Sequence, residues 1–407
     1  MRRPVVQPKR MLGKTSPRQN RGSTAVVKWL KDNRAAKCVK LKSSECNSTT
    51  SDADSFDSFH AVSVLRELAV LTTLRGSPHG NCIHCFDVIL HRDNLAIFVF
   101  PRYRSNVAVF LLQSDCTSMT ARHKSAIMLG LADALVHLHA HDIVHADVKW
   151  ENVLLNSASA KTEDVLIPCL CDFGMARANG TILDKSDTIT TLSHRPIELM
   201  AQQLSVTTAI DTWSFGVAAY GLCHHINHPF GHRNCADVLY NIMMSAPSVK
   251  RHWKIMRDLI AQLQLAPGCN TDQDCENQGI QRQSLRDWWA QEIKQEHLET
   301  NALRQIHLHA ESQTACDVAL SCFTVFDSAR PPMHVVRDSL LQATDYEPAR
   351  CTLAPETTGA FTDTVSAKPP ACMHPALCSA SPGTLYSAKG EFLRNWIKQD
   401  MQAFYNS

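Results

Sequence analysis

The sequence predicts an α+β protein in which a small strand-rich unit precedes a larger helical unit. Two observations support this prediction. Short apolar or alternating segments bounded by polar residues fill residues 24–41 and 85–100, which is typical of strands. Beyond about residue 103, apolar residues recur at helical spacing instead. Because strands and helices are segregated along the chain, we expect two packed units with a cleft between them.

The strand-rich unit is expected to contain two pairs of strands and one helix. Residues 24–41 alternate around a polar turn at 31–34, which predicts a first pair. Apolar residues at helical spacing predict an amphipathic helix over about 58–75. The apolar runs 85–90 and 95–100 are separated by four polar residues, which predicts an antiparallel hairpin.

The helical unit is expected to begin with residues 121–140, which carry an apolar stripe. Residues 209–223 are apolar nearly all round and predict a buried helix. Residues 346–385 are rich in Ala, Thr, Ser, Pro and Cys, so we expect no regular structure there. A short amphipathic helix is expected near the end of the chain, where four apolar residues share a face: Leu393, Trp396, Ile397 and Phe404.

The composition is that of a globular protein. The chain has 407 residues, of which 44% are hydrophobic and 20% charged, and its net charge is +2. These values exclude a mostly disordered chain and a uniformly basic, nucleic-acid-binding surface. No run approaches the roughly 18 apolar residues of a membrane-spanning helix, so no membrane partner is expected. The basic N-terminus lacks an apolar signal core, so we expect an intracellular protein, cytoplasmic or nuclear, with mostly reduced thiols.

The polar motifs of the chain are densest between the two predicted helices and shortly after them. The first is His145-Ala-Asp-Val-Lys-Trp-Glu-Asn152, and the second is Cys171-Asp-Phe-Gly174. Three more follow, which are Thr191-Leu-Ser-His-Arg-Pro-Ile-Glu198, Asp211-Thr-Trp-Ser-Phe-Gly216 and Ala329-Arg-Pro331. This ordered series resembles the signature of the eukaryotic-type protein kinase superfamily.

The match is specific at several positions. The first motif is similar to H-R-D-x-K-x-x-N except that Ala146 replaces the arginine, and the second is D-F-G. The third motif and the long segment 250–312 resemble those of the cyclin-dependent and MAP kinase branch of Ser/Thr kinases. Such divergence with the catalytic groups kept resembles the kinases of large DNA viruses. The resemblance covers roughly residues 12–343 and implies a bilobal protein-kinase-like fold, with a strand-rich N-lobe and a helical C-lobe.

The resemblance also implies an organisation along the chain. A basic tail over 1–11 would precede a kinase domain over 12–343, and a partly disordered C-terminal extension would cover 344–407. Within the domain we expect an N-lobe over about 12–100, a hinge at 101–103 and a C-lobe over about 104–343 with an insert at about 250–312.

The resemblance implies an ATP site between the lobes. Lys40, in Cys38-Val-Lys40, would contact the α- and β-phosphates, and Glu67 would hold its ammonium group. Gly22 and Val27 belong to the segment that would cover the phosphates, and Tyr103 belongs to the hinge. Of the three glycines that the family places in that covering loop, only Gly22 is matched.

The resemblance implies four catalytic residues. Asp172 would bind the Mg²⁺ that bridges the phosphates, and Asn152 would hold a second Mg²⁺. Asp147 would orient the substrate hydroxyl and accept its proton, and Lys149 would stabilise the transferring phosphoryl group. The implied activity is that of a Ser/Thr kinase that uses ATP and acts on protein substrates, with a regulatory protein as a further partner.

Three other residues would hold this site together. Asp211 would hydrogen-bond the backbone of the catalytic loop, which is the first motif, residues 145–152. Glu198 and Arg330 would form a buried ion pair that ties the substrate loop to the C-lobe.

Ala146 bears on regulation. In many relatives the arginine at this position pairs with a phosphorylated residue of the activation loop. Without that cation a phosphate has less to bind. We therefore expect activity that does not depend on phosphorylation of Thr188 or Thr190.

Two alternatives remain open. The loop that would cover the phosphates, which is glycine-rich in the family, keeps only one of its three glycines here. This loss also suits a pseudokinase that binds nucleotide as a scaffold. Residues 1–21 carry seven basic residues and no acidic one, which suits a nucleic-acid binder, although the near-neutral remainder allows only weak binding. Cysteine and histidine clusters at 82–85, 223–235 and 372–378 have some spacing of metal ligands, but structural roles are favoured.

Overall fold

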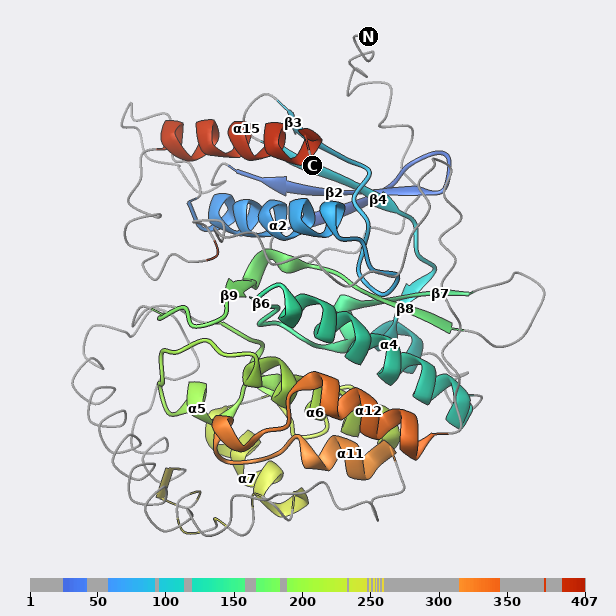
Figure 1. Ribbon diagram of the computed structural model, residues 1–407, viewed down its shortest axis with the longest axis vertical. Helices are drawn as coiled ribbons and strands as arrows, with labels where there is room; N and C mark the ends of the chain where they lie inside the picture. Colours follow the sequence, from blue (N-terminus) through green and yellow to red (C-terminus); the bar gives the residue numbers. More distant parts are fainter. Residues whose placement is uncertain are drawn as a thin grey trace.

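The structure is a computed structural model. It describes residues 25–41, 58–91, 95–112, 119–157, 166–183, 189–232, 234–246, isolated positions between 249 and 259, residues 315–344, residue 377 and residues 390–406. Over these residues the chain forms two lobes, one built on a sheet and one largely helical (Figure 1). The predicted α+β arrangement, with a strand-rich first part and a larger helical second part, is thereby confirmed.

The smaller lobe, which we call the N-lobe, is built on a four-stranded antiparallel sheet. Its strands are β1 (Ala25–Trp29), β2 (Arg34–Lys40), β3 (Asp87–His91) and β4 (Leu95–Pro101), in the spatial order β1-β2-β4-β3. The predicted first pair and the predicted hairpin are both present. Asp32 and Asn33 have positive φ angles of 61° and 57° in the turn between β1 and β2, a conformation that Asp and Asn tolerate.

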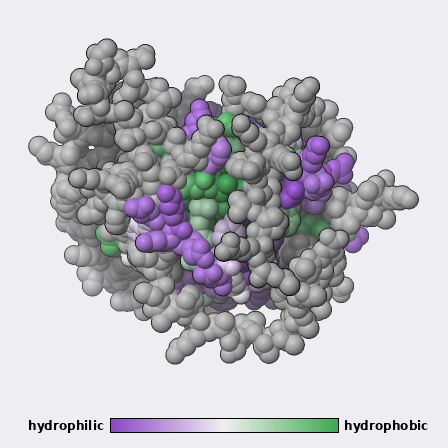
Figure 2. All heavy atoms as spheres, turned by 90° about the horizontal axis from the view of Figure 1, so that it is seen from above, coloured by the Kyte–Doolittle hydropathy of each residue, from purple (hydrophilic) through white to green (hydrophobic). Residues whose placement is uncertain are grey.

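Two helices complete the N-lobe. Helix α2 (Ser58–Gly76) contacts β2, and helix α15 (Gly390–Asn406) lies against α2 although it comes from the other end of the chain (Figure 1). Both helices were predicted from apolar periodicity, and both are confirmed. Figure 2 looks onto the molecule from the side of this lobe and shows hydrophilic side chains around a central apolar area.

The larger lobe, the C-lobe, packs helices against each other. Its main helices are α3 (Val107–Leu112), α4 (Ala121–Ala140), α5 (Ile197–Met200), α6 (Ala209–His224), α7 (Cys235–Ser245), α11 (Ala315–Ser321) and α12 (Met333–Ala343). Helix α4 begins at a capping box, in which Thr120 and His123 satisfy each other's backbone N–H groups. Helix α4 packs on α12 and α6, and α6 packs on α11. The predictions of helices over 121–140 and 209–223 are confirmed.

Short strands at the junction of the lobes hold the functional segments. Strand β6 (Ile143–Val144) pairs with β9 (Arg177–Ala178), while β5 (Ser105–Asn106), β7 (Val153–Ser157) and β8 (Leu166–Leu170) form a three-stranded sheet. The segment between β6 and β7 contains the first predicted motif, and the segment between β8 and β9 contains the second. The antiparallel pairing of these strands therefore brings the two motifs together.

Several predictions fall outside the described residues. These are the basic tail over 1–11, most of the insert over 250–312, and the segment 346–385 apart from Leu377, which is helical and buried. Among the residues that are described, none lies in a helix with the length and apolar character needed to cross a membrane.

Candidate active site

Lys37, Glu67 and Asp172 meet where the two lobes join. The Nζ atom of Lys37 donates to both carboxylate oxygens of Glu67, at 2.9 and 2.8 Å, and to Oδ1 of Asp172 at 2.7 Å. Burial acts to lower the pKa of Lys37, but the carboxylates of Asp172 and Glu67 outweigh burial, so its pKa is raised. Lys37 is therefore a fixed ammonium group held between β2, α2 and the segment after β8.

The prediction that Lys40 pairs with Glu67 is wrong. Successive side chains on a strand point to opposite faces of the sheet, so Lys37 and Lys40 lie on different faces. Lys37 and Val39 point toward α2, whereas Lys40 is exposed at the end of β2. The sequence did hold a signal for the right residue. Ala35-Ala36-Lys37 matches the A-x-K pattern that kinases have around their strand lysine, three positions before Cys38-Val-Lys40. Lys37 also shares the face of the buried Val39.

Asp211 holds the backbone of the catalytic loop, as predicted. Its carboxylate, on buried α6, accepts hydrogen bonds from the backbone N–H of His145 at 2.8 Å and of Ala146 at 2.9 Å. The Nε2 atom of His139 lies 2.9 Å from the same carboxylate. A second anchor is Trp150, whose indole N–H donates to the carbonyl of Ala218 on α6 at 2.8 Å. Helix α6 therefore fixes both ends of the loop.

Asp147 is the centre of the polar cluster in this loop. Its Oδ2 atom accepts from Lys149 Nζ at 2.8 Å and from Asn152 Nδ2 at 3.0 Å. Its Oδ1 atom accepts from the hydroxyl of Thr191 at 2.7 Å. Burial alone would raise the pKa of Asp147, but the Lys149 ammonium and the Thr191 hydroxyl outweigh it, so the pKa is lowered. Asp147 is thus an oriented, ionised carboxylate.

The structure brings together all four predicted catalytic residues. Asp147, Lys149 and Asn152 are joined directly. Asp172 adjoins them because the backbone N–H of the preceding Cys171 donates to the carbonyl of Asn152 at 2.9 Å. The hydroxyl of Thr191 was not predicted as a site residue, yet Lys149 Nζ donates to it at 2.7 Å. The position of Thr191 at the start of the third motif was the available signal.

The second motif places Asp172 beside Lys37 and buries its phenylalanine. Asp172 has a positive φ of 68°, and its side chain is 47% exposed. The Lys37 ammonium lowers the pKa of this carboxylate. Phe173 is fully buried and packs edge-on against the ring of His145, with 5.4 Å between the ring centroids. A Cβ atom at Gly174 would lie 2.3 Å from the hydroxyl oxygen of Ser63 on α2, so that hydroxyl would have to move.

Of the residues predicted to cover or flank the nucleotide, the structure describes Val27 and Tyr103. Val27 lies on β1 directly opposite Lys37 of β2, so the two side chains share a face of the sheet. Tyr103 follows β4 and is half-buried, and its hydroxyl donates to the sulfur of Cys169 at 3.1 Å. Gly22 lies outside the described residues.

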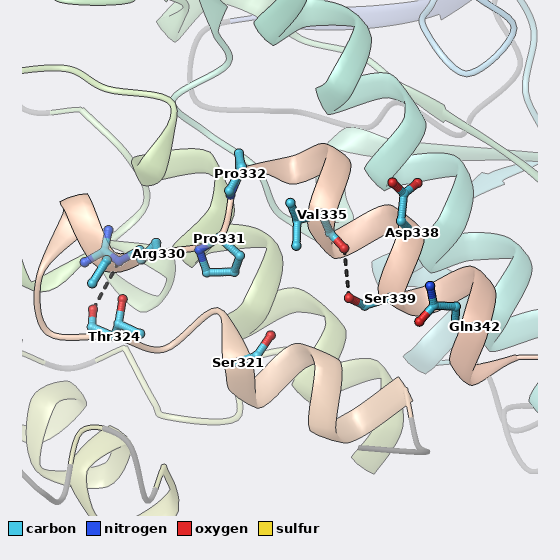
Figure 3. Close-up of a pocket in the computed structure, with 10 residues that line it drawn as sticks. Ser321, Thr324, Arg330, Pro331, Pro332, Val335, Asp338, Ser339 and Gln342 are labelled. Atoms are coloured by element: carbon cyan, nitrogen blue, oxygen red, sulfur yellow. Dashed lines mark hydrogen bonds between the residues drawn. The ribbon is translucent and has the colours of Figure 1, made fainter. Parts of the chain in front are cut away.

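Glu198 and Arg330 form the predicted buried ion pair. Arg330 Nη1 and Nη2 donate to the two carboxylate oxygens of Glu198 at 2.6 and 2.5 Å, which is a bidentate arrangement. The guanidinium group also lies 4.8 Å above the ring of Trp213. Its Nε donates to the carbonyl of Thr324 (Figure 3). The pair joins the end of the third motif to the C-lobe. A pocket of about 530 Å³ beside Arg330, between α11 and α12, is lined by none of the catalytic residues.

Ala146 lies inside an apolar cluster of the activation segment, the stretch between Asp172 and Glu198. Ala146 is 0% exposed and has a positive φ of 61°. The cluster is completed by Val144, Leu183, Ile189, Leu199, Val206 and Ile210. Leu183 and Ile189 belong to the activation segment itself, so apolar packing holds this segment against the catalytic loop.

The cysteine and histidine clusters show structural contacts where they are described. The thiols of Cys82 and Cys85 lie against backbone carbonyls, and burial raises the pKa of both. In the second cluster, His228 lies 3.7 Å from Glu151. Over the described part of the chain, no three His, Cys, Asp or Glu side chains are grouped as metal ligands would be. The third cluster lies outside the described residues.

Curated proteins similar to this chain are kinases. The chain is 30% identical over 166 residues to cyclin-dependent kinase 10 of Mus musculus, which is 40% of this chain and 43% of that protein. It is 25% identical over 198 residues to cyclin-dependent kinase G-1 of Oryza sativa subsp. indica, which is 48% of this chain and 26% of that protein. The chain thus spans less than half of the length of either relative.

The fold is also similar to that of a solved structure. The structure of the CAK complex from Chaetomium thermophilum bound to ATP-γ-S contains a chain that matches with a TM-score of 0.55 at 19% identity, over 83% of this chain and 92% of that one. At this level of identity the likeness concerns the fold alone. The model of the family described as the protein kinase domain matches residues 20–339. Because that match spans well over half of its length, the chain belongs to the protein kinase family.

Proposed function

We propose that this chain is a protein serine/threonine kinase, a transferase that moves the γ-phosphoryl group of ATP to Ser and Thr hydroxyls of protein substrates. The observation that carries the proposal is the position of Lys37, which bonds Glu67 and Asp172 at the same time. In kinases, the lysine–glutamate pair and the metal-binding aspartate must both be in place for phosphoryl transfer. All three groups of this chain meet that requirement in one arrangement.

Asp172 and Asn152 suit Mg²⁺, which prefers oxygen ligands. Asp172 presents a half-exposed carboxylate, and its depressed pKa keeps it ionised. Asn152 donates from Nδ2 to the backbone and side chain of Asp147, which leaves its amide oxygen as the atom to offer a cation. When bound, Mg²⁺ would neutralise the charge of the ATP phosphates.

The residues around Asp147 account for the chemistry. The oxygen of the substrate hydroxyl forms the new bond to the γ-phosphorus, the bond to the oxygen bridging the β- and γ-phosphates breaks, and ADP leaves. The hydroxyl proton passes to Asp147. Because the pKa of Asp147 is lowered, this carboxylate acts chiefly by orienting the hydroxyl. Lys149, 2.8 Å from Asp147, offers its ammonium group to the charge of the transferring phosphoryl group.

Lys149 and Thr191 support the Ser/Thr class. A lysine at this place in the catalytic loop and a threonine in the substrate loop resemble Ser/Thr kinases, and here the two side chains bond each other at 2.7 Å. Thr191 also bonds Asp147, so the substrate loop is tied directly to the group that would receive the substrate hydroxyl.

The test is transfer of radiolabelled phosphate from ATP to a generic basic protein. We expect Asp147→Asn to lower the rate by at least about 100-fold, because it removes the carboxylate that orients the substrate hydroxyl and receives its proton. Asp142→Asn is the matched control, since Asp142 is an exposed residue shortly before the catalytic loop. Acid hydrolysis of the product should yield phosphoserine and phosphothreonine. Equal labelling by the wild type and Asp147→Asn would contradict the proposal.

A pseudokinase is the second candidate, and the glycine-rich loop favours it. Only Gly22 matches the glycines of that loop, and side chains at the other two positions hinder close approach of backbone amides to phosphates. The test adds Mg²⁺–ATP to the purified chain. A rise in melting temperature without any phosphate transfer would support the pseudokinase function.

We also propose an intracellular location and a regulatory protein partner. The two relatives are named as cyclin-dependent kinases. For this chain we propose only that a regulatory protein binds, and purification from cells with mass spectrometry of co-purifying proteins would test this. Weak nucleic-acid binding through residues 1–21 stays a lesser proposal, and those residues lie outside the described part.

A further inference from the structure

Helix α2 is covered on every side. Residues 64–71 of α2 are all buried, and a helix buried all round must have neighbours on all of its faces. Among the described elements, α2 contacts β2, the short 3₁₀ turn Phe173–Met175 and α15. Strand β2 carries Lys37, and the 3₁₀ turn directly follows Asp172. Helix α2 therefore lies between the catalytic groups and α15.

Helix α15 is anchored by an apolar face. Ile397 and Phe404 are buried, and Trp396 and Met401 pack partly buried against the same core. Residues 397, 401 and 404 are spaced as one face of a helix. The remaining face is exposed at Gln399 and Gln402. The buried face joins the core that also contains Leu65, Leu68 and Leu71 of α2.

Two specific contacts fix the end of α15 against the N-lobe. The guanidinium group of Arg75, in the last turn of α2, lies 4.7 Å from the centre of the Phe404 ring. The hydroxyl of Tyr405 donates to the carboxylate of Asp87 and, at 2.7 Å, to the carbonyl of Val88 on β3. Helix α15 thus bridges α2 and the sheet.

A separate contact of the C-terminal extension reaches the activation segment. The buried hydroxyl of Thr181 lies 3.1 Å from the carbonyl of Leu377, which is itself buried. The extension therefore contacts both the helix that carries Glu67 and the segment that follows Asp172.

We propose that α15 is a positioning element built into the chain, which holds α2 at the depth where Glu67 reaches Lys37. The inference rests on the proposed kinase function. Glu67 is 2% exposed and bonds Lys37 with both oxygens, so a small outward shift of α2 would break the pair. Phe404 and Tyr405 are positioning residues in this arrangement, because they act on Lys37 only through α2.

The first test measures α2 directly and needs no ATP. In the full-length chain, Phe404→Ala and Tyr405→Phe should raise hydrogen exchange of the α2 amides by about tenfold, with α4 and α6 unchanged. Gln399→Ala, on the exposed face of the same helix, should leave α2 exchange as in the wild type. Unchanged exchange in α2 for both variants would overturn the proposal, whether or not the chain transfers phosphate.

The second test separates positioning from general stability. Phe404→Ala should lower phosphate transfer about tenfold in the wild-type background but less than twofold in a Glu67→Gln background, where the pair is already lost. Phe404→Leu, which keeps an apolar side chain at this position, should retain most of the wild-type rate of phosphate transfer. Equal loss in both backgrounds would show that α15 acts only on overall stability, which would contradict the inference. A wild-type chain that transfers no phosphate would refute the proposed function. The hydrogen-exchange experiment would still decide whether α15 positions α2.

Discussion

Lys37 of β2 and Glu67 of α2 form a buried ion pair across the N-lobe, with the ammonium nitrogen 2.9 and 2.8 Å from the two carboxylate oxygens. The same ammonium reaches Asp172 at 2.7 Å, so one side chain links a strand, a helix and the segment that enters the C-lobe. Removing Lys37 would leave the buried carboxylate of Glu67 without its partner.

Lys37→Met should abolish most phosphate transfer while Lys40→Met should not. Lys37 is the lysine that bonds Glu67 and Asp172, whereas Lys40 is exposed at the end of β2. We expect a loss of at least about 100-fold for Lys37→Met and a change within about twofold for Lys40→Met. The initial rate of labelling from radiolabelled ATP measures both. A greater loss for Lys40→Met would restore the assignment made from the sequence.

Activity should not depend on phosphorylation of the activation segment. Ala146 lies in an apolar cluster with Leu183 and Ile189, so that cluster offers a phosphate no cation. Thr190 is itself buried. Treating the purified chain with a phosphatase should therefore leave its rate within about twofold. A chain switched on by phosphate at Thr188 or Thr190 would contradict this prediction and would point to Arg195, whose Nε donates to the Thr190 hydroxyl at 3.4 Å, as the cation that binds it.

Arg330→Met should unfold the C-lobe more readily than Arg337→Met. Arg330 is buried with Glu198, so its removal leaves a buried carboxylate unpaired, and we expect a loss of about 3–5 kcal/mol of unfolding free energy. Arg337 is partly exposed on α12 beside Asp338, where loss of a pair costs less than about 1 kcal/mol. Urea denaturation followed by circular dichroism compares them. Similar midpoints for the two variants would mean that the buried pair adds no stability.

His194 should make the protein less stable as the pH falls below about 6.5. Burial, with a smaller effect of His228, lowers the pKa of His194 to about 3 in the folded chain. In the unfolded chain an ordinary histidine has a pKa of about 6.5. Between these values only the unfolded chain binds the proton, so acid favours unfolding by up to about 1.4 kcal/mol per pH unit.

Urea midpoints at pH 7.5 and 5.5 measure this dependence. His194→Gln cannot take up the proton and should flatten the difference between the two midpoints. Some difference between the two midpoints should remain in His194→Gln, because burial also lowers the pKa of His79, to about 4. His334→Gln, at an exposed position of α12, should keep the full wild-type difference. An undiminished difference in His194→Gln would show that His194 does not titrate on unfolding.

Local patterns predicted much of the fold. Helix α4 spans residues 121–140 as expected, because its apolar stripe repeats at helical spacing and its capping residues are adjacent in sequence. The catalytic loop was found because its residues are contiguous. Lys37 was missed because two lysines on one strand both fit a short motif, and only packing against α2 decides which face is the inner one.

Long-range packing was beyond such patterns. The apolar face of α15 was visible in the sequence, but the surface that it covers was not. Tyr405 contacts Asp87 across 318 positions of the chain, and a periodic pattern contains no information about a partner that far away. For the same reason the apolar cluster around Ala146 could not be foreseen, since its members come from five separate segments.

The burial of Ala146 also limits how this chain can evolve. An arginine at this position would need the space now filled by Leu183, Ile189 and Ile210. Each first step toward it would leave either a cavity or a buried unpaired charge, at a cost of a few kcal/mol out of a typical total of about 5–15 kcal/mol. A lineage that has packed its activation segment in this way would place an arginine at this position only through several coordinated substitutions, so the packing is hard to undo.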